Sequence, residues 1–467
     1  NFASVFHGIR FKVRRLFVVM TSNFFCYLPK GYGFIDYDIP FTMAENSVKS
    51  NSKSIYMAQN CSNPITYHTL SNRLRVVHRY CDSRVECCGL CVMAGSRNEQ
   101  PEQFGLAHFV EHTIFKGTDR RRSWHIINRM ESVGGELNAF TSEEATTIYS
   151  SFPAGNLARA VELIADLVSR SRFPEAEIDR EREVVLDEVD SYLDSPAEAI
   201  FDDFNELLFA GSGLGHNILG NEKTIKTFTS ATCRDFLDRY YTPGNTVFFY
   251  MGPATPKRVV ATAERYMGHF SHPDTHVDRV VPPEVEPFDI YRDLHTHQAH
   301  TVIGARIPGM FADKNRAYSL LTNIIGGPCM NSLLNVALRE RRGYVYSVDA
   351  YTSLFTDCGE MTIYFGCDRE HVKPCRRIIS DTLTHLADSP MKERTLSAAK
   401  KQYIGQTIVA AENREQMALS TGRALLFNGH VATRSEIIDR IMSLTPEHLR
   451  MAAEAIVSDR CSILTFG

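Results

Sequence analysis

The five residues His108-Phe109-Val110-Glu111-His112 constrain this chain more than any other segment. In a helix, two histidines four residues apart lie on the same face, so both imidazoles can reach a single metal ion. Glu111 directly precedes the second histidine, where its carboxylate can hold a water molecule beside that ion. The spacing His-x-x-Glu-His therefore predicts a helix that supplies two metal ligands and one catalytic carboxylate.

A zinc ion that performs hydrolysis needs three protein ligands and one open position, so a third ligand must come from elsewhere. Residues 179–189 contain neither Gly nor Pro, and we expect them to be helical. Glu181 and Glu188 are seven positions apart there, which places them on one helical face. We expect Glu188 to be the third ligand and Glu181 to orient a histidine or a water. The alternative is a charged, solvated helix.

Four motifs occur in an order that resembles a known family. With them, the chain from about Ile65 to Gly467 resembles the pitrilysin/insulysin superfamily of inverted-motif zinc metallopeptidases, the inverzincins. It looks most similar to the β subunit of mitochondrial processing peptidase and its bacterial single-chain, homodimeric relatives. The motifs span residues 105–118, 134–146, 181–188 and 339–347.

The resemblance implies one Zn²⁺ per chain, bound by His108, His112 and Glu188. It also implies that Glu111 acts as general base and then as general acid in peptide hydrolysis. The expected function is a zinc-dependent endopeptidase that cleaves extended oligopeptides or unfolded, presequence-like segments inside a closed chamber. The alternative is a non-catalytic scaffold or peptide-binding subunit of the same family, although such members usually lose zinc ligands.

The pair Gly134-Gly135, followed by Glu-Leu-Asn-Ala-Phe-Thr, predicts a tight turn that enters a strand. The resemblance implies that this is an edge strand whose backbone pairs with an extended peptide at Asn138, Ala139 and Phe140. Such strand addition gives affinity with little sequence preference. An ordinary hairpin is the alternative.

Arg339 and Tyr346 match an Arg–Tyr pair seven positions apart in the family. The resemblance implies that they hold the substrate carbonyl and the oxyanion, and a guanidinium and a phenol are suitable donors for that charge. Tyr344 lies on the same face of an extended segment and remains a second candidate phenol. The alternative is that Arg339 is a surface cation on a helix at 333–342 and that Tyr346 serves packing.

The folded part of the chain looks duplicated. A shift of 215 positions (362 − 147) aligns Thr147-Ile148-Tyr149 with Thr362-Ile363-Tyr364. At this offset Asn323, Gly327 and Tyr403 stand where the first half has its three predicted ligands. We therefore expect one metal site per chain. Strand-like runs alternate with long helices, which predicts an α+β fold of two homologous domains, each an antiparallel-rich sheet packed with helices.

The predicted organisation has four parts. Residues 1–60 form an extension that is either disordered or foreign to the fold. A catalytic zinc domain spans 61–271, a polar, Pro-rich linker spans 272–292, and a homologous domain without zinc spans 293–467. Because the family builds its chamber from four such domains, the resemblance implies half of a clam-shell chamber per chain. It therefore implies a homodimer or a heterodimer with a related subunit.

Composition narrows the cellular setting. The net charge of −4 gives no indication of a nucleic-acid partner, and no run approaches the ~18–20 apolar residues of a membrane span. The twelve cysteines favour a reducing compartment, and we expect Cys81, Cys87, Cys88 and Cys91 to be buried as small apolar residues. A bacterial cytoplasm fits these thiols. The alternative is an organelle matrix, because residues 1–35 are basic and lack acidic residues, as in a transit peptide.

Overall fold

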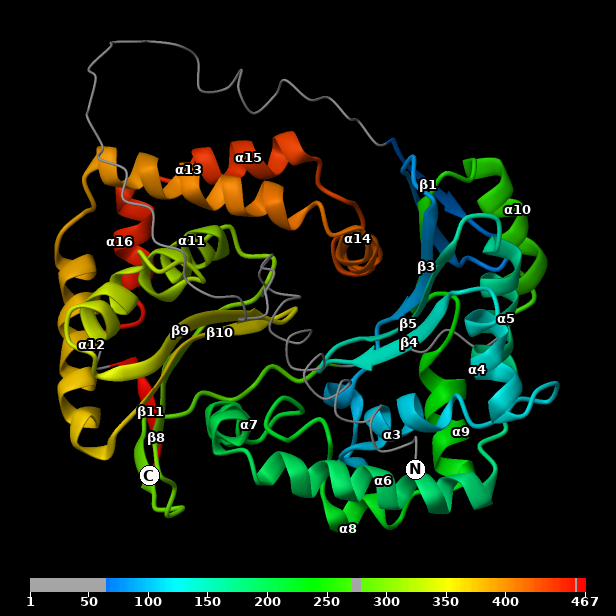
Figure 1. Ribbon diagram of the computed structural model, residues 1–467, viewed down its shortest axis with the longest axis horizontal. Helices are drawn as coiled ribbons and strands as arrows, with labels where there is room; N and C mark the ends of the chain where they lie inside the picture. The colour runs from blue at the N-terminus through cyan, green and yellow to red at the C-terminus, as the bar shows by residue number, and fades with distance from the viewer. Residues whose placement is uncertain (1–63, 271–278, 458–459) are drawn as a thin grey trace, which may run out of the picture.

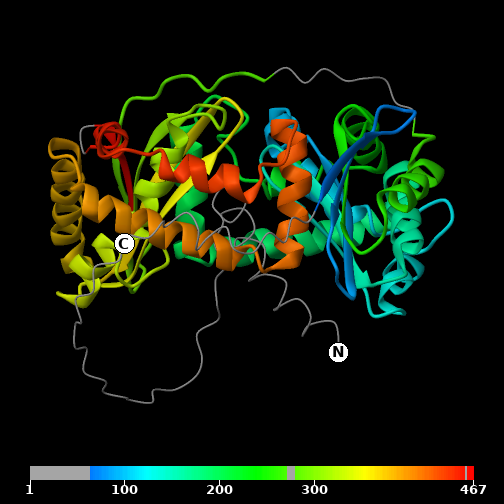
Figure 2. The same cartoon turned by 90° about the horizontal axis from the view of Figure 1, so that it is seen from above.

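The computed structural model describes residues 64–270, 279–457 and 460–467. They form two sheets, each with helices packed on it, which stand in opposite halves of the molecule (Figures 1 and 2). The expected α+β fold with two domains is confirmed. The predicted extension at 1–60 lies outside the described residues. We call residues 64–270 the first domain and the described residues from 289 onward the second domain.

The first domain is built on a six-stranded sheet whose spatial order is β1-β2-β6-β3-β5-β4. Only β2 and β6 are parallel to each other, and every other neighbouring pair is antiparallel. The strands are β1 (Ile65–Thr69), β2 (Arg75–Tyr80), β3 (Val85–Val92), β4 (Glu136–Thr141), β5 (Thr146–Pro153) and β6 (Thr246–Gly252). The helices are α3 (Leu106–Thr113), α4 (Ser123–Glu131), α5 (Leu157–Arg170), α6 (Glu175–Leu193), α7 (Pro196–Leu208), α8 (Glu222–Ile225), α9 (Ser230–Tyr240) and α10 (Pro256–Met267), with short turns η1 (Ser96–Asn98) and η2 (Pro101–Gln103).

The second domain is built on a five-stranded sheet whose order is β7-β11-β8-β10-β9. Its strands are β7 (Asp289–Arg292), β8 (Ala299–Pro308), β9 (Val345–Leu354), β10 (Cys358–Cys367) and β11 (Ser462–Phe466). Its helices are α11 (Asn315–Gly326), α12 (Val372–Asp388), α13 (Glu393–Ala410), α14 (Arg414–Asn428), α15 (Arg434–Met442) and α16 (Pro446–Glu454), with a π-helix η3 (Asn335–Glu340) and a short turn η4 (Arg369–His371).

The sheet topology confirms the duplication. Without β1, the first sheet has the order β2-β6-β3-β5-β4, and the second repeats it as β7-β11-β8-β10-β9. The single parallel pair falls in the same place in both sheets, as β2 with β6 and β7 with β11. The aligned triplets at 147–149 and 362–364 lie in the equivalent strands β5 and β10.

The predicted linker boundary needs one correction. Residues 289–292 form β7, which pairs in parallel with β11 from Ile463 to Phe466. The second domain therefore begins at least four residues before the predicted start at 293 (293 − 289). The sequence concealed this strand because β7 is a short, partly exposed edge strand that follows a Pro-rich segment, so it lacks a run of buried apolar residues.

Each domain gives one helix to the other domain's sheet. Helix α7 packs on the second sheet, where Ile200 and Phe204 are buried with Leu464. Helix α14 packs on the first sheet, where Leu419 is buried with Phe249. Both helices lie between the two sheets (Figure 1). The sequence boundaries therefore do not mark independent units, since either half alone would expose an apolar sheet face.

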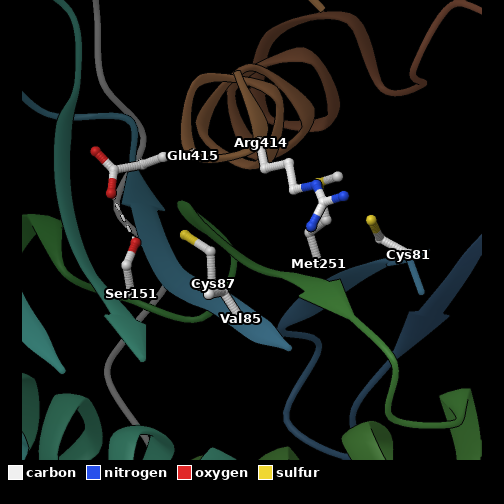
Figure 3. Close-up of a pocket in the computed structure, with 7 residues that line it drawn as sticks. All are labelled: Cys81, Val85, Cys87, Ser151, Met251, Arg414 and Glu415. Carbon is white, nitrogen blue, oxygen red and sulfur yellow. Dashed lines mark hydrogen bonds between the residues drawn. The ribbon is translucent and has the colours of Figure 1, made fainter. Parts of the chain in front are cut away.

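The two faces of β3 show how α14 completes the first sheet. Cys88 faces the core that contains α3, whereas Cys87 and Cys91 face α14. As predicted, these thiols are buried, and burial raises the pKa of Cys87 to about 12 and that of Cys91 to about 11. A small pocket opens between α14 and this face (Figure 3), lined by Cys81, Val85, Cys87, Ser151, Met251, Arg414 and Glu415.

A buried ionic network joins the two domains. Arg97 Nη1 lies 2.8 Å from Glu144 Oε1, and its guanidinium forms a bidentate pair with Asp357 at 2.7 and 2.5 Å. Asp357 lies in the turn between β9 and β10, so this pair crosses the domain boundary. Thr356 N–H donates to Glu144 Oε2 over 2.9 Å. Removing one partner from such a buried network typically costs about 3–5 kcal/mol.

Glu360, in β10, makes stability depend on pH at the same boundary. Burial, and then the negative charge of Glu143, raise the pKa of its carboxyl from 4.5 to about 8. The folded chain therefore binds a proton here that the unfolded chain releases above about pH 4.5. The stabilisation by that proton is complete at low pH and is lost as pH rises through about 8.

We expect Glu360→Gln, which keeps the size and removes the ionisation, to flatten this dependence. Between pH 5.5 and 7.5 the wild-type chain should lose about 2–3 kcal/mol of unfolding free energy that the variant keeps. Thermal or urea unfolding at both pH values measures the difference. The control is Glu131→Gln, at an exposed position on α4. An equal effect of Glu360→Gln at both pH values would contradict the assignment.

Candidate metal centre

Helix α3 carries the His-x-x-Glu-His motif into the first core. It begins after Gly105, whose φ of +97° is a left-handed conformation that suits glycine. Leu106, Phe109 and Val110 are completely buried in the core of the first domain. Because these residues anchor one side of a helix of only eight residues, His108 and His112 lie together on another.

Helix α6 confirms the predicted helix at 179–189 and extends it to Glu175–Leu193. Its buried residues are Ile178, Glu181, Val185 and Glu188, which recur at intervals of three, four and three residues. That spacing is one face of a helix, and this face packs against α3. Glu181 and Glu188 therefore lie on an otherwise apolar face of α6 that packs against α3, the helix with the two histidines.

The three predicted ligands come together. One side-chain donor atom from each of His108, His112 and Glu188 lies within 4.8 Å of the other two. His112 Nε2 lies 3.3 Å from Glu188 Oε2, and His108 Nε2 lies 3.9 Å from Glu188 Oε1. Two imidazole nitrogens and one carboxylate facing one point form the donor set of a catalytic zinc site, so these residues fit the ion. Within the described ranges, this is the only such group of three or more His, Cys, Asp or Glu residues.

Glu181 contacts the ring nitrogen of His112 that faces away from Glu188. Its Oε1 lies 3.0 Å from His112 Nδ1, and its Oε2 lies 2.5 Å from Lys116 Nζ. Burial raises the pKa of Glu181, but the hydrogen bonds from His112 and Lys116 outweigh it and lower that pKa overall. A carboxylate can only accept a hydrogen bond, so Nδ1–H of His112 donates to Glu181, and Nε2 is left as the nitrogen available to a metal ion. Sequence reasoning missed Lys116, which lies four positions after His112 and beyond the end of α3 at Thr113.

Glu111 is buried beside the ligands. Only 4% of Glu111 is exposed, which is unusual for a residue with a carboxylate side chain. Burial of the Tyr241 hydroxyl raises its pKa, and the negative charge of Glu111 raises it further. The phenol of Tyr241 is therefore near this carboxylate. A carboxylate held in a buried position next to a metal ligand is suited to proton transfer.

The predicted strand at Asn138–Phe140 is β4, and it is an edge strand. It follows a turn at Gly134, whose φ is +74°, and among the described residues β5 is its one partner strand. Helix α3 packs against β4, with Ala139 partly buried on the side of the α3 core. The free edge of a sheet therefore lies next to the helix that carries the two histidines (Figure 1).

Arg339 and Tyr346 lie in the second domain, on η3 and β9, whereas the ligand group lies in the first domain, on α3 and α6. The predicted helix at 333–342 is a π-helix over Asn335–Glu340. The Tyr346 hydroxyl is exposed and donates to Asp368 Oδ1 over 3.1 Å, and that hydrogen bond raises the pKa of Tyr346. Tyr344 instead stacks on the ring of His371 and packs on the second core, which favours Tyr346 as the accessible phenol.

The pocket of Figure 3 is a different place from this centre. It opens on the α14 face of the first sheet, while α3 packs on the opposite face. Its two thiols are buried and are not part of any group suited to a metal among the described residues. Over those same residues, no helix has the length and apolar character needed to cross a bilayer.

Comparison with known proteins places this geometry in a family. Residues 76–222 match Insulinase (Peptidase family M16), and residues 227–403 match the Peptidase M16 inactive domain. The "uncharacterized zinc protease SCO5738" of Streptomyces coelicolor is 28% identical over 91% of this chain and 94% of its own length. The "uncharacterized zinc protease Rv2782c" of Mycobacterium tuberculosis is 30% identical over 85% of this chain and 92% of its own length.

Solved structures show the same fold. A protease from Helicobacter pylori superposes with a TM-score of 0.80 at 19% identity, covering 86% of this chain and 99% of the other. A peptidase M16 inactive domain from Pseudomonas fluorescens superposes with a TM-score of 0.79 at 17% identity, covering 86% and 98%. The family models match both halves of the chain, and Rv2782c is 30% identical over most of both chains. The chain therefore belongs to peptidase family M16, within the pitrilysin/insulysin superfamily that its motifs resemble.

Proposed function

We propose that this chain is a zinc-dependent endopeptidase that cleaves extended oligopeptides or unfolded, presequence-like segments inside a closed chamber. One observation carries the proposal: the ligand group on α3 and α6 lies beside the free edge of β4. A peptide that adds to β4 as a further strand would run past that group. Relatives named zinc proteases support the identity of the ion.

In the proposed mechanism, His108, His112 and Glu188 hold one Zn²⁺ per chain. When bound, zinc supplies a Lewis acid that polarises the scissile carbonyl and acidifies water to a pKa of roughly 7. Glu111 takes the proton of the attacking water and returns it to the leaving amine. Burial of Glu111 keeps competing water away from this proton transfer.

Substrate alignment is assigned to the backbone of Asn138, Ala139 and Phe140. Pairing through the main chain would hold the peptide extended and make few demands on its side chains. This supports a preference for unfolded segments over folded proteins, because most of the backbone of a folded protein is already hydrogen-bonded within its own helices and sheets. Processing of presequences, as in mitochondrial processing peptidase, and general peptide degradation both fit this arrangement.

We further propose a homodimer, or a heterodimer with a related subunit, in which Arg339 and Tyr346 of one chain complete the centre of the other. The support is that one chain holds the ligand group and the Arg–Tyr pair in separate domains. To act on a substrate carbonyl, Tyr346 must turn its hydroxyl away from Asp368. A tyrosine hydroxyl is protonated at neutral pH, which an oxyanion donor requires.

The second candidate function is a non-catalytic scaffold or peptide-binding subunit. The match of residues 227–403 to an inactive domain favours it for the second half of the chain. In the first half, the three ligands and Glu111 are all present, which favours the enzyme.

For the cellular compartment, we propose the bacterial cytoplasm, with an organelle matrix as the alternative. Bacterial relatives and ten unpaired cysteines among the described residues support a reducing compartment.

The first test is cleavage of a fluorogenic, unstructured peptide by the zinc-loaded chain, with and without a chelator. We expect chelator-sensitive cleavage, and a roughly 10²- to 10⁴-fold loss in Glu111→Gln with its zinc content unchanged. Elemental analysis measures the zinc. An active Glu111→Gln variant would refute the mechanism, and no cleavage by a wild-type chain with bound zinc would favour the scaffold or a missing partner.

Glu181→Ala should weaken zinc binding about 10- to 100-fold, because His112 loses the acceptor that fixes its ring. Competition with a chromophoric chelator measures the affinity. Glu183→Ala removes an exposed glutamate from the same helix and should leave the affinity unchanged. If both variants bind zinc equally well, Glu181 does not orient the ligand.

Mixing two inactive variants tests the dimer. If Tyr346 acts across the interface, a mixture of Glu111→Gln and Tyr346→Phe chains forms mixed dimers with one intact centre. Activity should recover to about one quarter of wild type after subunit exchange. If each chain uses its own Tyr346, no centre is intact and nothing recovers. Sedimentation of a fully active monomer would also exclude the shared centre.

A further inference from the structure

Helix α3 is capped by a residue that is not part of the motif. Its N-cap, Gly105, has no side chain that could satisfy the exposed N–H groups of the first turn. The carboxylate of Glu99 does this instead: Oε2 accepts the N–H of Gly105 over 2.8 Å, and Oε1 accepts the N–H of Ala107 over 2.6 Å. Ala107 directly precedes the ligand His108, so the cap acts at the start of the metal site.

Glu99 is itself held by the stacked rings of His216 and Phe104, which we call the aromatic clamp. Its side chain is completely buried, and its Oε2 lies 3.0 Å from Nε2 of His216, whose side chain is 6% exposed. The His216 ring stacks on Phe104, with centroids 3.7 Å apart and planes 9° apart. A buried negative charge at a helix N-terminus is favourable only while its partners stay in place.

The clamp is tied to the second domain through the loop that carries His216. Near its start, Phe209 and Leu214 are buried against the second sheet with Val302. Near its end, Gly220 lies so close to the start of α3 that a Cβ there would clash with the carbonyl oxygen of Phe104. The loop therefore joins the second core to the first residues of the metal helix.

A second connection reaches Glu99 from the other side. Arg97, two residues earlier in the chain, forms the bidentate pair with Asp357 of the second domain. Gly213, in the His216 loop, approaches the Arg97 carbonyl oxygen so closely that a Cβ would stand 2.5 Å away. Both routes therefore end on the segment 97–99 that caps α3.

We propose that Glu99 and His216 are positioning residues for the metal centre, and that the second domain, which lacks metal ligands, holds them in place. An isolated helix of two turns is unstable, so the axial position of α3 depends on its cap. A shift of that cap moves His108 relative to Glu188. This inference rests on the proposed metal site and gives the domain without ligands a role in it.

Cobalt replaces zinc in the test, because the visible absorption of Co²⁺ reports the geometry of its ligands without any substrate. Glu99→Gln puts an amide N–H where an acceptor is needed, and His216→Phe keeps the stack on Phe104 but removes the hydrogen bond to Glu99. We expect both variants to bind Co²⁺ more weakly, by about tenfold for Glu99→Gln. We also expect changed absorption bands in both.

The matched control is His78→Phe. His78 is also buried, its Nε2–H donates to Ala254 O over 2.8 Å, and its ring stacks on Tyr250, but it lies on β2. We expect His78→Phe to lower Tm about as much as His216→Phe does. The affinity for Co²⁺ and the spectrum of the bound ion should stay unchanged. Asp357→Asn should alter the spectrum in the same direction as Glu99→Gln if the second domain holds the cap.

The outcomes separate the two ideas. A wild-type chain that binds no Co²⁺ overturns the metal site and the inference with it. A wild-type chain that binds Co²⁺, with Glu99→Gln and His216→Phe matching its affinity and spectrum, overturns the positioning role alone. A changed spectrum in Glu99→Gln together with an unchanged one in Asp357→Asn overturns the role of the second domain.

Discussion

The burial of carboxylates between α6 and α3 is the constraint on which the rest of this structure depends. Glu181 and Glu188 occupy positions that an ordinary amphipathic helix would fill with apolar side chains. An isolated buried carboxylate is costly, so each needs a cationic or hydrogen-bonding partner. Lys116 and His112 meet that need for Glu181, and a divalent cation would meet it for Glu188. A metal ion bound at this group would therefore also offset the cost of burying Glu188.

A metal site between α3 and α6 requires α3 to hold a fixed position, and a helix of only two turns is not stable without contacts to the rest of the chain. Its apolar side chains lock it into the first core, while the N-terminal cap comes from Glu99. The remote cap explains how a duplicated half without ligands can still matter. The second domain receives α7 on its own sheet, contributes α14 to the first sheet, and pairs with Arg97 across the boundary. The family's "inactive" half is therefore structurally continuous with the centre.

Sequence reasoning succeeded where a local pattern encodes the result. The motif gave the ligand helix, the spacing of Glu181 and Glu188 gave a shared helical face, and Gly134-Gly135 gave the turn into an edge strand. It failed where the signal is not local. The short strand β7 has no apolar run, the register of η3 departs from the α-helical pattern, and helix exchange leaves no mark on the periodicity of α7 or α14.

The sequence by itself determined which side chains the candidate centre could use, since His108, Glu111 and His112 share one short helix at the spacing of a metal-binding motif. It also determined that the second half lacks those ligands. Only the tertiary structure decided which groups support the centre. Lys116, Glu99 and His216 act through distances across separate elements. A buried hydrogen bond or ion pair depends on where two backbones meet, and that is set by packing of the whole core rather than by any one segment.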